Sequence, residues 1–279
     1  MKTVALALGG GGARGLAHIV VLEALDEMGI KPAAVAGTSI GALIGAAYAA
    51  GMSGREIRRY VIALAHDRGE VFRRLMAARA SRWSDLFSAG FGSAMLLDAE
   101  KFCTQFLPKE VPEDFGALHI PLTIVASDLH RRQQVAFSSG PLRPPLAASM
   151  ALPSLVRPVL FENMVLVDGG ATNPLPFEHL RGHADVVVAV DISGEPSETR
   201  RDLPSPWECF LMTVLVMGSA ITAEKLKHGA PDLVIRPNVG LFRTLDLFRA
   251  SAVLRAAEAG KAEFKERLAA LLGRSQQRP

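Results

Sequence analysis

Cysteine is scarce in this chain: only Cys103 and Cys209 occur among 279 residues. Two cysteines are too few for a disulfide framework, and they show neither CxxC nor metal-ligand spacing, so we expect free thiols in a reducing compartment. We also expect no secretory signal, because residues 1–8 run directly into glycines without a long apolar core and a small-residue cleavage site. Both absences favour a cytoplasmic protein.

Long uninterrupted apolar runs are missing as well. Residues 35–52 are broken by glycine and hydroxyl side chains, and residues 210–221 are too few to cross about 30 Å of hydrocarbon as a helix. We therefore predict that both segments are buried core elements and that no helix spans a membrane. Since 49% of the residues are apolar and 21% are charged, the chain can bury a proper core, which excludes intrinsic disorder for most of it.

Aromatic residues make up only 6% of the chain, and neither zinc-finger spacing nor an aromatic RNA-binding motif occurs, which argues against nucleic-acid binding. Positive charge is nevertheless concentrated in residues 53–84, where eight arginines stand against three acidic residues in a chain of net charge +3. One interpretation is a solvated helical face. The other is an electrostatic contact with an anionic surface such as phospholipid headgroups.

Strands and helices alternate at the start of the chain. Short apolar runs predict strands at residues 3–8 and 33–36, and apolar residues at helical spacing predict helices at 16–28 and 40–50. This order implies parallel strands joined by right-handed crossovers. Further along, the patterns predict helices at 53–80, 98–107, 144–152, 207–227 and 249–272, and strands at 121–127, 133–138, 164–167, 186–190 and 233–236.

A glycine-rich segment, Gly9 to Gly15, lies between the first strand and the first helix. Gly10, Gly12 and Gly15 fit the G-x-G-x-x-G pattern of a dinucleotide site, but the second predicted strand ends without the acidic residue that holds the ribose. A P-loop is excluded because no Gly-Lys-Ser/Thr follows. Consecutive glycines at a helix N-terminus still let several backbone N–H groups converge on one anion, either a phosphate or a reaction oxyanion. A purely structural tight turn is the alternative.

A second glycine motif follows the second predicted strand. Gly37-Thr38-Ser39-Ile40-Gly41 has the G-x-S-x-G pattern between a strand and a helix, which is the context of a nucleophile elbow. The flanking glycines permit a close backbone approach that a Cβ would block. Parallel neighbouring strands bring this serine and the glycine-rich segment to the same edge of the sheet, so a nucleophile and an anion site would lie side by side. That combination predicts acyl transfer.

The serine needs a base, and for each of the seven histidines we expect a surface or structural role. Asp128, Asp168 and Asp191 are more suggestive, because each ends an apolar strand at the edge where active sites of parallel sheets collect. Only Asp168 is followed by two glycines, Gly169 and Gly170, which permit a tight turn and close backbone approach. Asp168 is therefore the first candidate, and Asp128 and Asp191 are interpreted as turn or cap residues.

Together these motifs resemble those of patatin-like phospholipases of the bacterial type: the glycine-rich segment, the serine elbow and Asp168-Gly169-Gly170, in this order. The resemblance covers residues 4–236 and includes residues 148–153, which look like the family's stretch before the aspartate motif. Two departures do not touch the serine or the aspartate. Gly9 stands where plant patatins have aspartate, and Gly170 stands where many members have alanine.

The resemblance implies a three-layer α/β/α sandwich with a mainly parallel central sheet, and the activity of a lipid acyl hydrolase. It further implies that Ser39 attacks the ester carbonyl, that Asp168 is the base of a Ser–Asp dyad, and that neither metal nor organic cofactor takes part. A carboxylate with a pKa near ~3.9 is a poor base for a hydroxyl, so we expect a dry apolar setting around Asp168. The resemblance places the oxyanion on the amides of the glycine-rich segment, namely Gly10, Gly11, Gly12, Ala13, Arg14 and Gly15.

The patterns predict a catalytic domain at residues 1–240 and a helical extension at residues 241–279 that packs on it and ends in a frayed tail. An acyltransferase or a thioesterase would use the same acyl-enzyme, because the motifs do not encode the acceptor. The second hypothesis is a non-catalytic regulatory binding protein, against which the intact motifs weigh, and a nucleotide-binding protein is the third. The expected partners are a lipid or acyl-ester substrate and an anionic membrane, contacted peripherally through residues 53–84.

Overall fold

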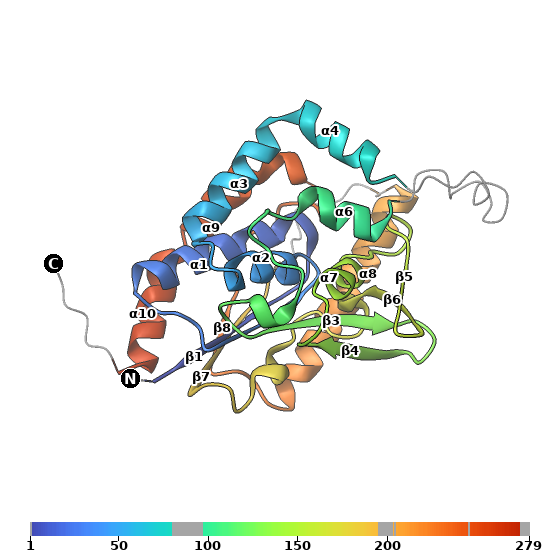
Figure 1. Cartoon of the computed structure of the whole chain (residues 1–279). Coiled ribbons are helices and arrows are strands. Elements are labelled where there is room, and N and C mark those ends of the chain that lie inside the picture. Colours follow the sequence, from blue (N-terminus) through green and yellow to red (C-terminus); the bar gives the residue numbers. More distant parts are fainter. Residues whose placement is uncertain (1, 80–96, 195–202, 204, 245, 274–279) are drawn as a thin grey trace.

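A mixed sheet of eight strands lies at the centre of the molecule, with helices on both sides (Figure 1). The computed structural model describes residues 2–79, 97–194, 203, 205–244 and 246–273. The sheet has the strand order β5-β6-β3-β2-β1-β7-β8, and β4 also pairs with β3. Four of the pairings are parallel, as the mainly parallel α/β/α prediction requires, and the pairings of β3 with β4 and β6, and of β5 with β6, are antiparallel. The strands are β1 Val4–Leu8, β2 Ala34–Thr38, β3 Leu122–Asp128, β4 Gln133–Phe137, β5 Val159–Phe161, β6 Met164–Asp168, β7 Val186–Val190 and β8 Leu233–Ile235.

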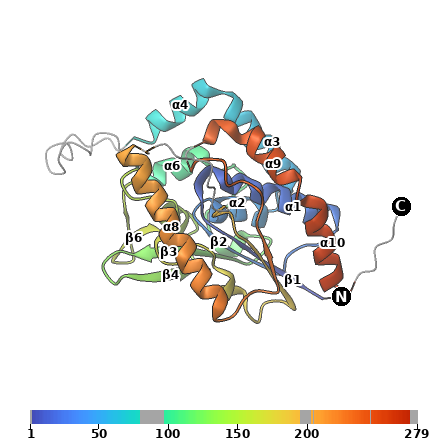
Figure 2. The ribbon, with the colours of Figure 1, turned by 180° about the vertical axis from the view of Figure 1, so that it is seen from behind.

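The two faces of the sheet bury side chains of different size. Along β1, Val4, Leu6 and Leu8 point into the main core, while Ala5 and Ala7 point to the other face, as the period of a strand requires. The main core is completed by α1 His18–Glu27, α2 Ile40–Ala49, α7 Arg143–Ser149 and the C-terminal helices. The alanine face is covered by the segment around η5 Phe177–Leu180 and by the end of α8 Pro206–Lys227, which crosses this side of the sheet in Figure 2.

The arginine-rich segment forms two helices where one was predicted. A capping box between Ser53 and Glu56 begins α3 Gly54–His66. The Asp67 side chain then accepts a hydrogen bond from the Glu70 amide and begins α4 Arg68–Ala77. The chain therefore turns at Asp67, and Figure 1 shows α4 continuing above α6 Ala99–Phe106. Residues 80–96, which include Arg82 of this segment, lie outside the described part of the chain.

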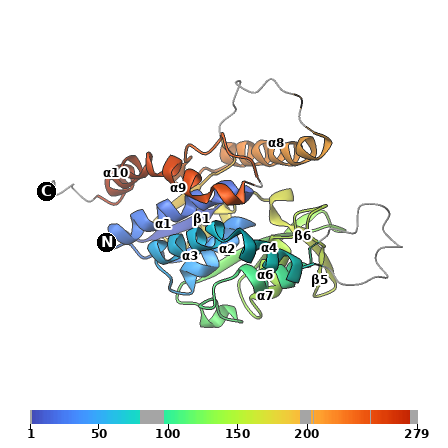
Figure 3. The ribbon, with the colours of Figure 1, turned by 90° about the horizontal axis from the view of Figure 1, so that it is seen from above.

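The last described helices pack against the start of the chain. α9 Ala250–Glu258 and α10 Lys261–Leu271 lie along α1, and α9 also packs on the 3-10 helix η1 Gly12–Ala17, as Figure 3 shows for α9 and α10 beside α1. The short helix η6 Leu247–Arg249 contacts α3. An ion-pair cluster joins the two ends. Buried Glu23 accepts two hydrogen bonds of 2.6 Å from Arg58, and Lys261 lies 3.5 Å from the same carboxylate. The expected frayed tail falls on residues outside the described part, apart from Gly273.

The structure corrects the prediction for residues 210–221. These residues belong to α8, which has 22 residues. Within residues 208–227, an 18-residue window has a mean hydropathy of 1.5, and only 17% of that window is buried. Among the described residues, this is one helix long and apolar enough, by length and composition, to cross a membrane. The prediction counted only the apolar residues and left out the helical turns with polar residues at either end of α8. Apolar composition alone also does not show that this helix lies outside the core. In contrast, most of residues 35–49 are buried in β2 and α2, as predicted, and the last three residues of the predicted segment follow α2.

The contact between η1 and α2 depends on the absence of a side chain at Gly15. A Cβ there would lie 2.2 Å from Cγ2 of Ile40. We predict that Gly15→Ala lowers the free energy of unfolding by about 1–3 kcal/mol through overpacking. Adding Ile40→Ala removes the clash, so urea denaturation of both single variants and the double variant should give a coupling energy of about 1 kcal/mol or more. Strictly additive effects would contradict this packing.

Candidate active site

Strand β3 aligns the ends of two other strands. β2 pairs with β3 up to the partners Thr38 and Val125, and β6 pairs with it from the partners Asp168 and Ala126 onward. β4 pairs with both stretches of β3, so β2 and β6 share the opposite edge. The last residue of β2 and the last residue of β6 therefore meet end to end. The residue that follows β2 is Ser39, and this topology brings it to Asp168.

Ser39 sits in a strained turn between β2 and α2. Its φ of 56° and ψ of −125° are unusual for a residue with a side chain. The turn requires glycine on both sides, because a Cβ at Gly37 would lie 2.6 Å from the Ala42 backbone and one at Gly41 would lie 2.1 Å from the Leu8 carbonyl oxygen. These are the tight contacts that the G-x-S-x-G pattern predicts.

Two hydroxyl groups hold this turn. The Ser39 amide donates a 2.8 Å hydrogen bond to Oγ of Ser149, which in turn donates to the Val125 carbonyl at 2.7 Å. The Thr38 hydroxyl donates to the Asn173 carbonyl at 2.8 Å. Ser149 was quoted only as part of the stretch before the aspartate motif, and its contact with Ser39 was not predicted. No periodicity or spacing in the sequence signals a contact between residues 110 positions apart.

The Asp168 carboxylate is buried and has two hydrogen-bond donors. Ser39 Oγ donates to Oδ2 at 2.6 Å, and the Gly170 amide donates to Oδ1 at 2.7 Å. Burial raises the pKa of Asp168 to about 6, although both hydrogen bonds act in the opposite direction. Gly169 lets the chain pass close to β3, since a Cβ at this position would lie 2.2 Å from the Val125 carbonyl oxygen. The carboxylate of the Asp168-Gly169-Gly170 motif therefore lies in the dry setting expected for it from the sequence.

The glycine-rich segment lies beside Ser39, and its amides differ in what they contact. The Gly10 amide donates to the Pro174 carbonyl at 2.9 Å, and the Ala13 amide donates to the Thr244 carbonyl at 2.8 Å. These two amides are therefore engaged, which corrects the expectation that every amide of the segment faces an oxyanion. The amides of Gly11 and Gly12 have no acceptor among the described residues, and both glycines line the cavity that contains Ser39.

The remaining residues of the segment brace it. Arg14 is buried, and its guanidinium lies against the carbonyl groups of Gly11 and Ser193. Gly15 provides the close contact with Ile40 of α2. His18 is also fully buried, where it donates through Nε2 to the Gly9 carbonyl at 2.8 Å. Burial lowers the pKa of His18 to about 4, so it is neutral at physiological pH and holds the loop.

The other two strand-end aspartates make local contacts, as the sequence predicted. Asp128 accepts hydrogen bonds of 3.0 Å from the amides of His130 and Arg131, and these bonds lower its pKa. Asp191 accepts a hydrogen bond of 3.0 Å from the Ser193 amide and one of 3.1 Å from Arg236. Both carboxylates close turns, and neither contacts Ser39.

A cavity of about 410 Å³ opens beside Ser39 and Asp168. Its walls come from α2, α3, α4, α6 and α8, and most of its side chains are aliphatic or aromatic. Among the described residues that line it, Asp168 is the one charged residue, and none is a histidine. Within the described part of the chain, no group of three or more histidine, cysteine, aspartate or glutamate residues could hold a metal ion. Chemically, the arrangement suits attack by a hydroxyl on a carbonyl attached to an apolar chain.

Comparison with known proteins agrees with this geometry. The sequence matches the family described as patatin-like phospholipase over residues 6–181. It is 36% identical over 200 residues to an uncharacterized NTE family protein of Mycobacterium tuberculosis, which covers 71% of this chain and 51% of that protein. It is 29% identical over 295 aligned positions to Lysophospholipase NTE1 of Coccidioides immitis, which covers 96% of this chain and 18% of that protein.

The chain therefore belongs to the patatin-like phospholipase family, as its motifs predicted. It spans about half the length of its mycobacterial relatives and under a fifth of the fungal one. The crystal structure of VipD from Legionella pneumophila has a TM-score of 0.51 with this structure at 15% sequence identity, over 95% of this chain and 66% of that one. This likeness confirms the fold.

The buried Asp168 carboxylate should control both activity and stability. We predict that ester hydrolysis rises with pH through a midpoint near 6, because only the ionised Asp168 carboxylate can accept the proton of the Ser39 hydroxyl. Since its pKa is raised above the unfolded value, ionisation costs the folded state about 3 kcal/mol, and this stability is lost as pH rises through 6. Asp168→Asn should lower kcat by at least about 10²-fold and, in thermal unfolding, gain stability relative to the wild type between pH 5 and pH 8.

Asp128→Asn is the matched control, because Asp128 also ends a strand but has a lowered pKa and no contact with Ser39. This variant should keep the wild-type midpoint of the activity profile. A wild-type profile that is flat between pH 5 and pH 8, or an Asp168→Asn variant that keeps wild-type turnover, would contradict the role of the buried carboxylate.

Ser149 should matter for both folding and turnover. Ser149→Ala leaves the Ser39 amide and the Val125 carbonyl without their partner, at a cost of about 1–3 kcal/mol in the free energy of unfolding. We expect kcat to fall while KM stays near its wild-type value, because the turn that aims the nucleophile is loosened. Denaturation in urea and steady-state kinetics on a soluble ester test this, and an unchanged kcat would show that the turn holds without Ser149.

Proposed function

We propose that this chain is a serine lipid acyl hydrolase in which Ser39 is the nucleophile and Asp168 is the base. The observation that carries the proposal is the 2.6 Å hydrogen bond from Ser39 Oγ to the buried Asp168 carboxylate, beside an apolar cavity. We assign the oxyanion hole to the amides of Gly11 and Gly12, which lack acceptors among the described residues. The position of Ser39 just before the first turn of α2 supports the same assignment, because a helix N-terminus favours negative charge.

In the first half of the reaction, Ser39 Oγ bonds to the ester carbonyl carbon while its proton passes to Asp168 Oδ2. The carbonyl oxygen becomes an oxyanion, which the amides of Gly11 and Gly12 stabilise. Collapse of this intermediate breaks the bond to the alcohol, which takes the proton back from Asp168. The product is an acyl ester on Ser39.

In the second half, water attacks the acyl-Ser39 carbonyl and gives its proton to Asp168. The oxyanion forms in the same place, collapse releases the fatty acid, and Asp168 returns the proton to Ser39 Oγ. A raised pKa makes Asp168 a better base for this exchange than an exposed aspartate. The same carboxylate thus serves both halves, so no second base is required.

The cavity supports a substrate with a long apolar acyl chain. Its lining side chains can enclose hydrocarbon, and within the part of the chain that the structure describes no lysine or arginine lines it to hold a phosphate. We therefore place the acyl chain inside the cavity and the headgroup of the lipid at its mouth. The phospholipase name of the family and the lysophospholipase name of the fungal relative support a lipid ester as the substrate class.

We also propose a peripheral contact between the arginine-rich segment and anionic lipid. Part of this segment is internally neutralised, because Arg58 pairs with Glu23 and Glu258, and Arg73 and Arg74 pair with Glu70. The contact is therefore assigned to the exposed Arg55, Arg59 and Arg68. Each arginine near an anionic surface contributes about 1 kcal/mol, so these three make the attraction weak and sensitive to salt.

Active-site labelling tests the proposed nucleophile. A fluorophosphonate should modify the wild type at Ser39, and Ser39→Ala should lose both the label and the hydrolysis of a p-nitrophenyl acyl ester. The variant should remain folded, because the substitution removes one hydroxyl. Wild-type protein that hydrolyses no ester and takes no label would favour the non-catalytic binding protein, and a Ser39→Ala variant with wild-type turnover would place the nucleophile elsewhere.

A further inference from the structure

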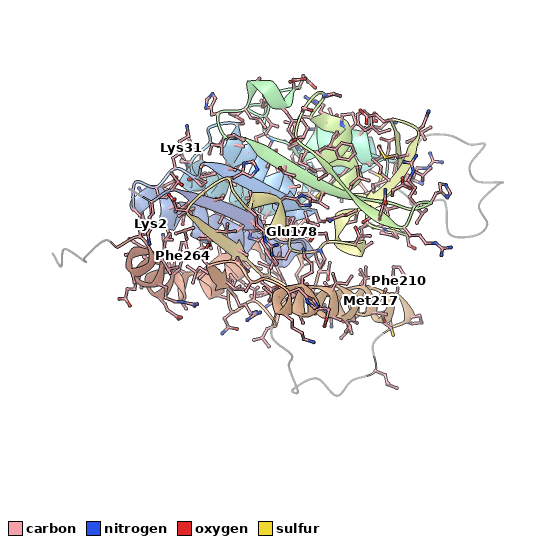
Figure 4. The ribbon with its side chains drawn as sticks, turned by 90° about the horizontal axis from the view of Figure 1, so that it is seen from below. Lys2, Lys31, Glu178, Phe210, Met217 and Phe264 are labelled. Atoms are coloured by element: carbon pink, nitrogen blue, oxygen red, sulfur yellow. The ribbon has the colours of Figure 1, made fainter. Side chains whose placement is uncertain are left out.

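Helix α8 is apolar on both of its sides. On the inner side, Leu211, Val214 and Leu215 line the cavity beside Ser39. On the outer side, large apolar side chains face solvent: Phe210 is 39% exposed, Met212 45%, Val216 67% and Met217 57%. Figure 4 shows Phe210 and Met217 on this helix. An ordinary surface helix has charged or polar residues on its outer side, so α8 departs from the usual pattern.

The outer face of α8 also lacks polar groups that need water. Residues 209–223 contain no charged side chain. The exposed Thr213 hydroxyl donates to the Cys209 carbonyl at 2.9 Å, so it is satisfied within the helix. We call Cys209, Phe210, Met212, Val216 and Met217 the outer patch. A contiguous apolar surface of this kind is typical of a site that another apolar surface covers.

The rotation of α8 is fixed, so the outer patch cannot turn inward. Near the C-terminal end, Lys225 Nζ lies 2.6 Å from a Glu178 carboxylate oxygen and donates to the Leu175 carbonyl at 2.8 Å. At the N-terminal end, Glu208 pairs with Arg243 at 3.3 Å. Between them, Gly218 faces Pro174, where the helix crosses the segment that follows Asp168. These contacts hold the inner side against the cavity and leave the outer patch facing away.

Exposed apolar residues also occur on other elements that form the cavity. Phe72 is 64% exposed and Met76 is 44% exposed on α4, which lines the cavity through other residues, and Phe248 of η6 both lines the cavity and is 48% exposed. Two aromatic rings in this part of the molecule have a cation over them. The Arg68 guanidinium lies 5.3 Å from the centre of the Phe248 ring, and the Arg249 guanidinium lies 5.1 Å from the centre of the Phe242 ring. Apolar side chains next to cations are typical of surfaces that lie at the headgroup level of a bilayer.

Resting on the lipid hydrolase function proposed above, we propose that the outer patch of α8 docks into the surface of an anionic lipid bilayer. The helix then lies in the interface, with its outer patch among the lipid chains and its inner side forming the wall of the cavity. This places Ser39 about one helix diameter, ~10 Å, behind the membrane surface. A lipid ester can then enter the apolar cavity without crossing water.

The bilayer is a better occupant of this face than a second copy of the chain. The outer patch presents no charged or unpaired polar group that would set the register of a protein–protein contact, whereas a fluid lipid surface needs none. The cations beside the aromatic rings complement anionic headgroups and would repel their counterparts on an identical chain.

The decisive variant is Val216→Glu/Met217→Glu, which places charge in the outer patch without altering a residue that lines the cavity. Its matched control is Leu160→Glu on β5, where an apolar side chain is 74% exposed outside α8. We expect the double variant to bind vesicles of phosphatidylcholine and phosphatidylglycerol in equal parts at least about tenfold more weakly than the wild type in co-sedimentation, and to lose vesicle-lipid hydrolysis in proportion. Hydrolysis of a soluble p-nitrophenyl ester should stay within about twofold, and the control should match the wild type in every assay.

A fluorescent probe identifies the face that docks. Cys209 is exposed within the outer patch and Cys103 is buried, so an environment-sensitive dye attaches selectively to Cys209. On vesicles its emission should shift to the blue, and higher salt should weaken this response without abolishing it. An unchanged emission from vesicle-bound protein would overturn the proposal in favour of docking through the arginine-rich segment alone.

Two further outcomes would overturn the proposal. One is a double variant that binds vesicles like the wild type. The other is a wild-type dimer that the double variant converts to a monomer with vesicle binding unchanged, which would assign the outer patch to self-association. Failure of the proposed chemistry gives a different result, because Ser39→Ala removes ester hydrolysis but should bind vesicles with wild-type affinity. The docking and the catalytic proposals can therefore fail separately.

Discussion

The shared edge of β3 is the constraint on which the site depends. β2 and β6 end at adjacent positions along this edge, so Ser39 and Asp168 meet although they lie 129 positions apart in the sequence. Neither residue reaches this position through a flexible loop. Each follows directly from a strand that is hydrogen-bonded to β3, and the glycines at positions 37, 41 and 169 allow the backbones to approach closely. The distance between the Ser39 hydroxyl and the Asp168 carboxylate is therefore set by the register of the sheet.

The same packing shields the Asp168 carboxylate from water, and this burial lowers the stability of the folded protein. Placing a carboxylate at the end of β6 beneath the cavity raises its pKa, so ionisation of Asp168 opposes folding near neutral pH. The turn at Ser39 adds backbone strain, which the Ser149 and Thr38 hydroxyls hold in place. We interpret both costs as part of the function, because a relaxed serine beside a hydrated aspartate would be a weak nucleophile next to a weak base.

Much of this arrangement could be predicted from the sequence, because glycines at fixed spacing and aspartates at strand ends are local signals. Contacts between distant residues were not predictable. The hydrogen bond between Ser39 and Ser149 depends on how α7 packs on β3. The amides of Gly10 and Ala13 are occupied by the carbonyl groups of Pro174 and Thr244, which lie far away in the sequence. The position of α8 was predicted wrongly because apolar composition was equated with burial, although this helix packs through only one side. The exposure of its outer patch was therefore not predicted from the sequence.

The central claim is that Ser39 carries the acyl group during turnover, and trapping that intermediate tests it most directly. Protein mixed with an excess of a p-nitrophenyl acyl ester is quenched in acid within the first turnovers, and the intact mass and the digested peptides are then measured. The account predicts an added mass equal to one acyl group, located on the peptide that contains Ser39 and absent from Ser39→Ala. An acyl group on another residue, or continued turnover with no acylated protein at any time, would contradict it.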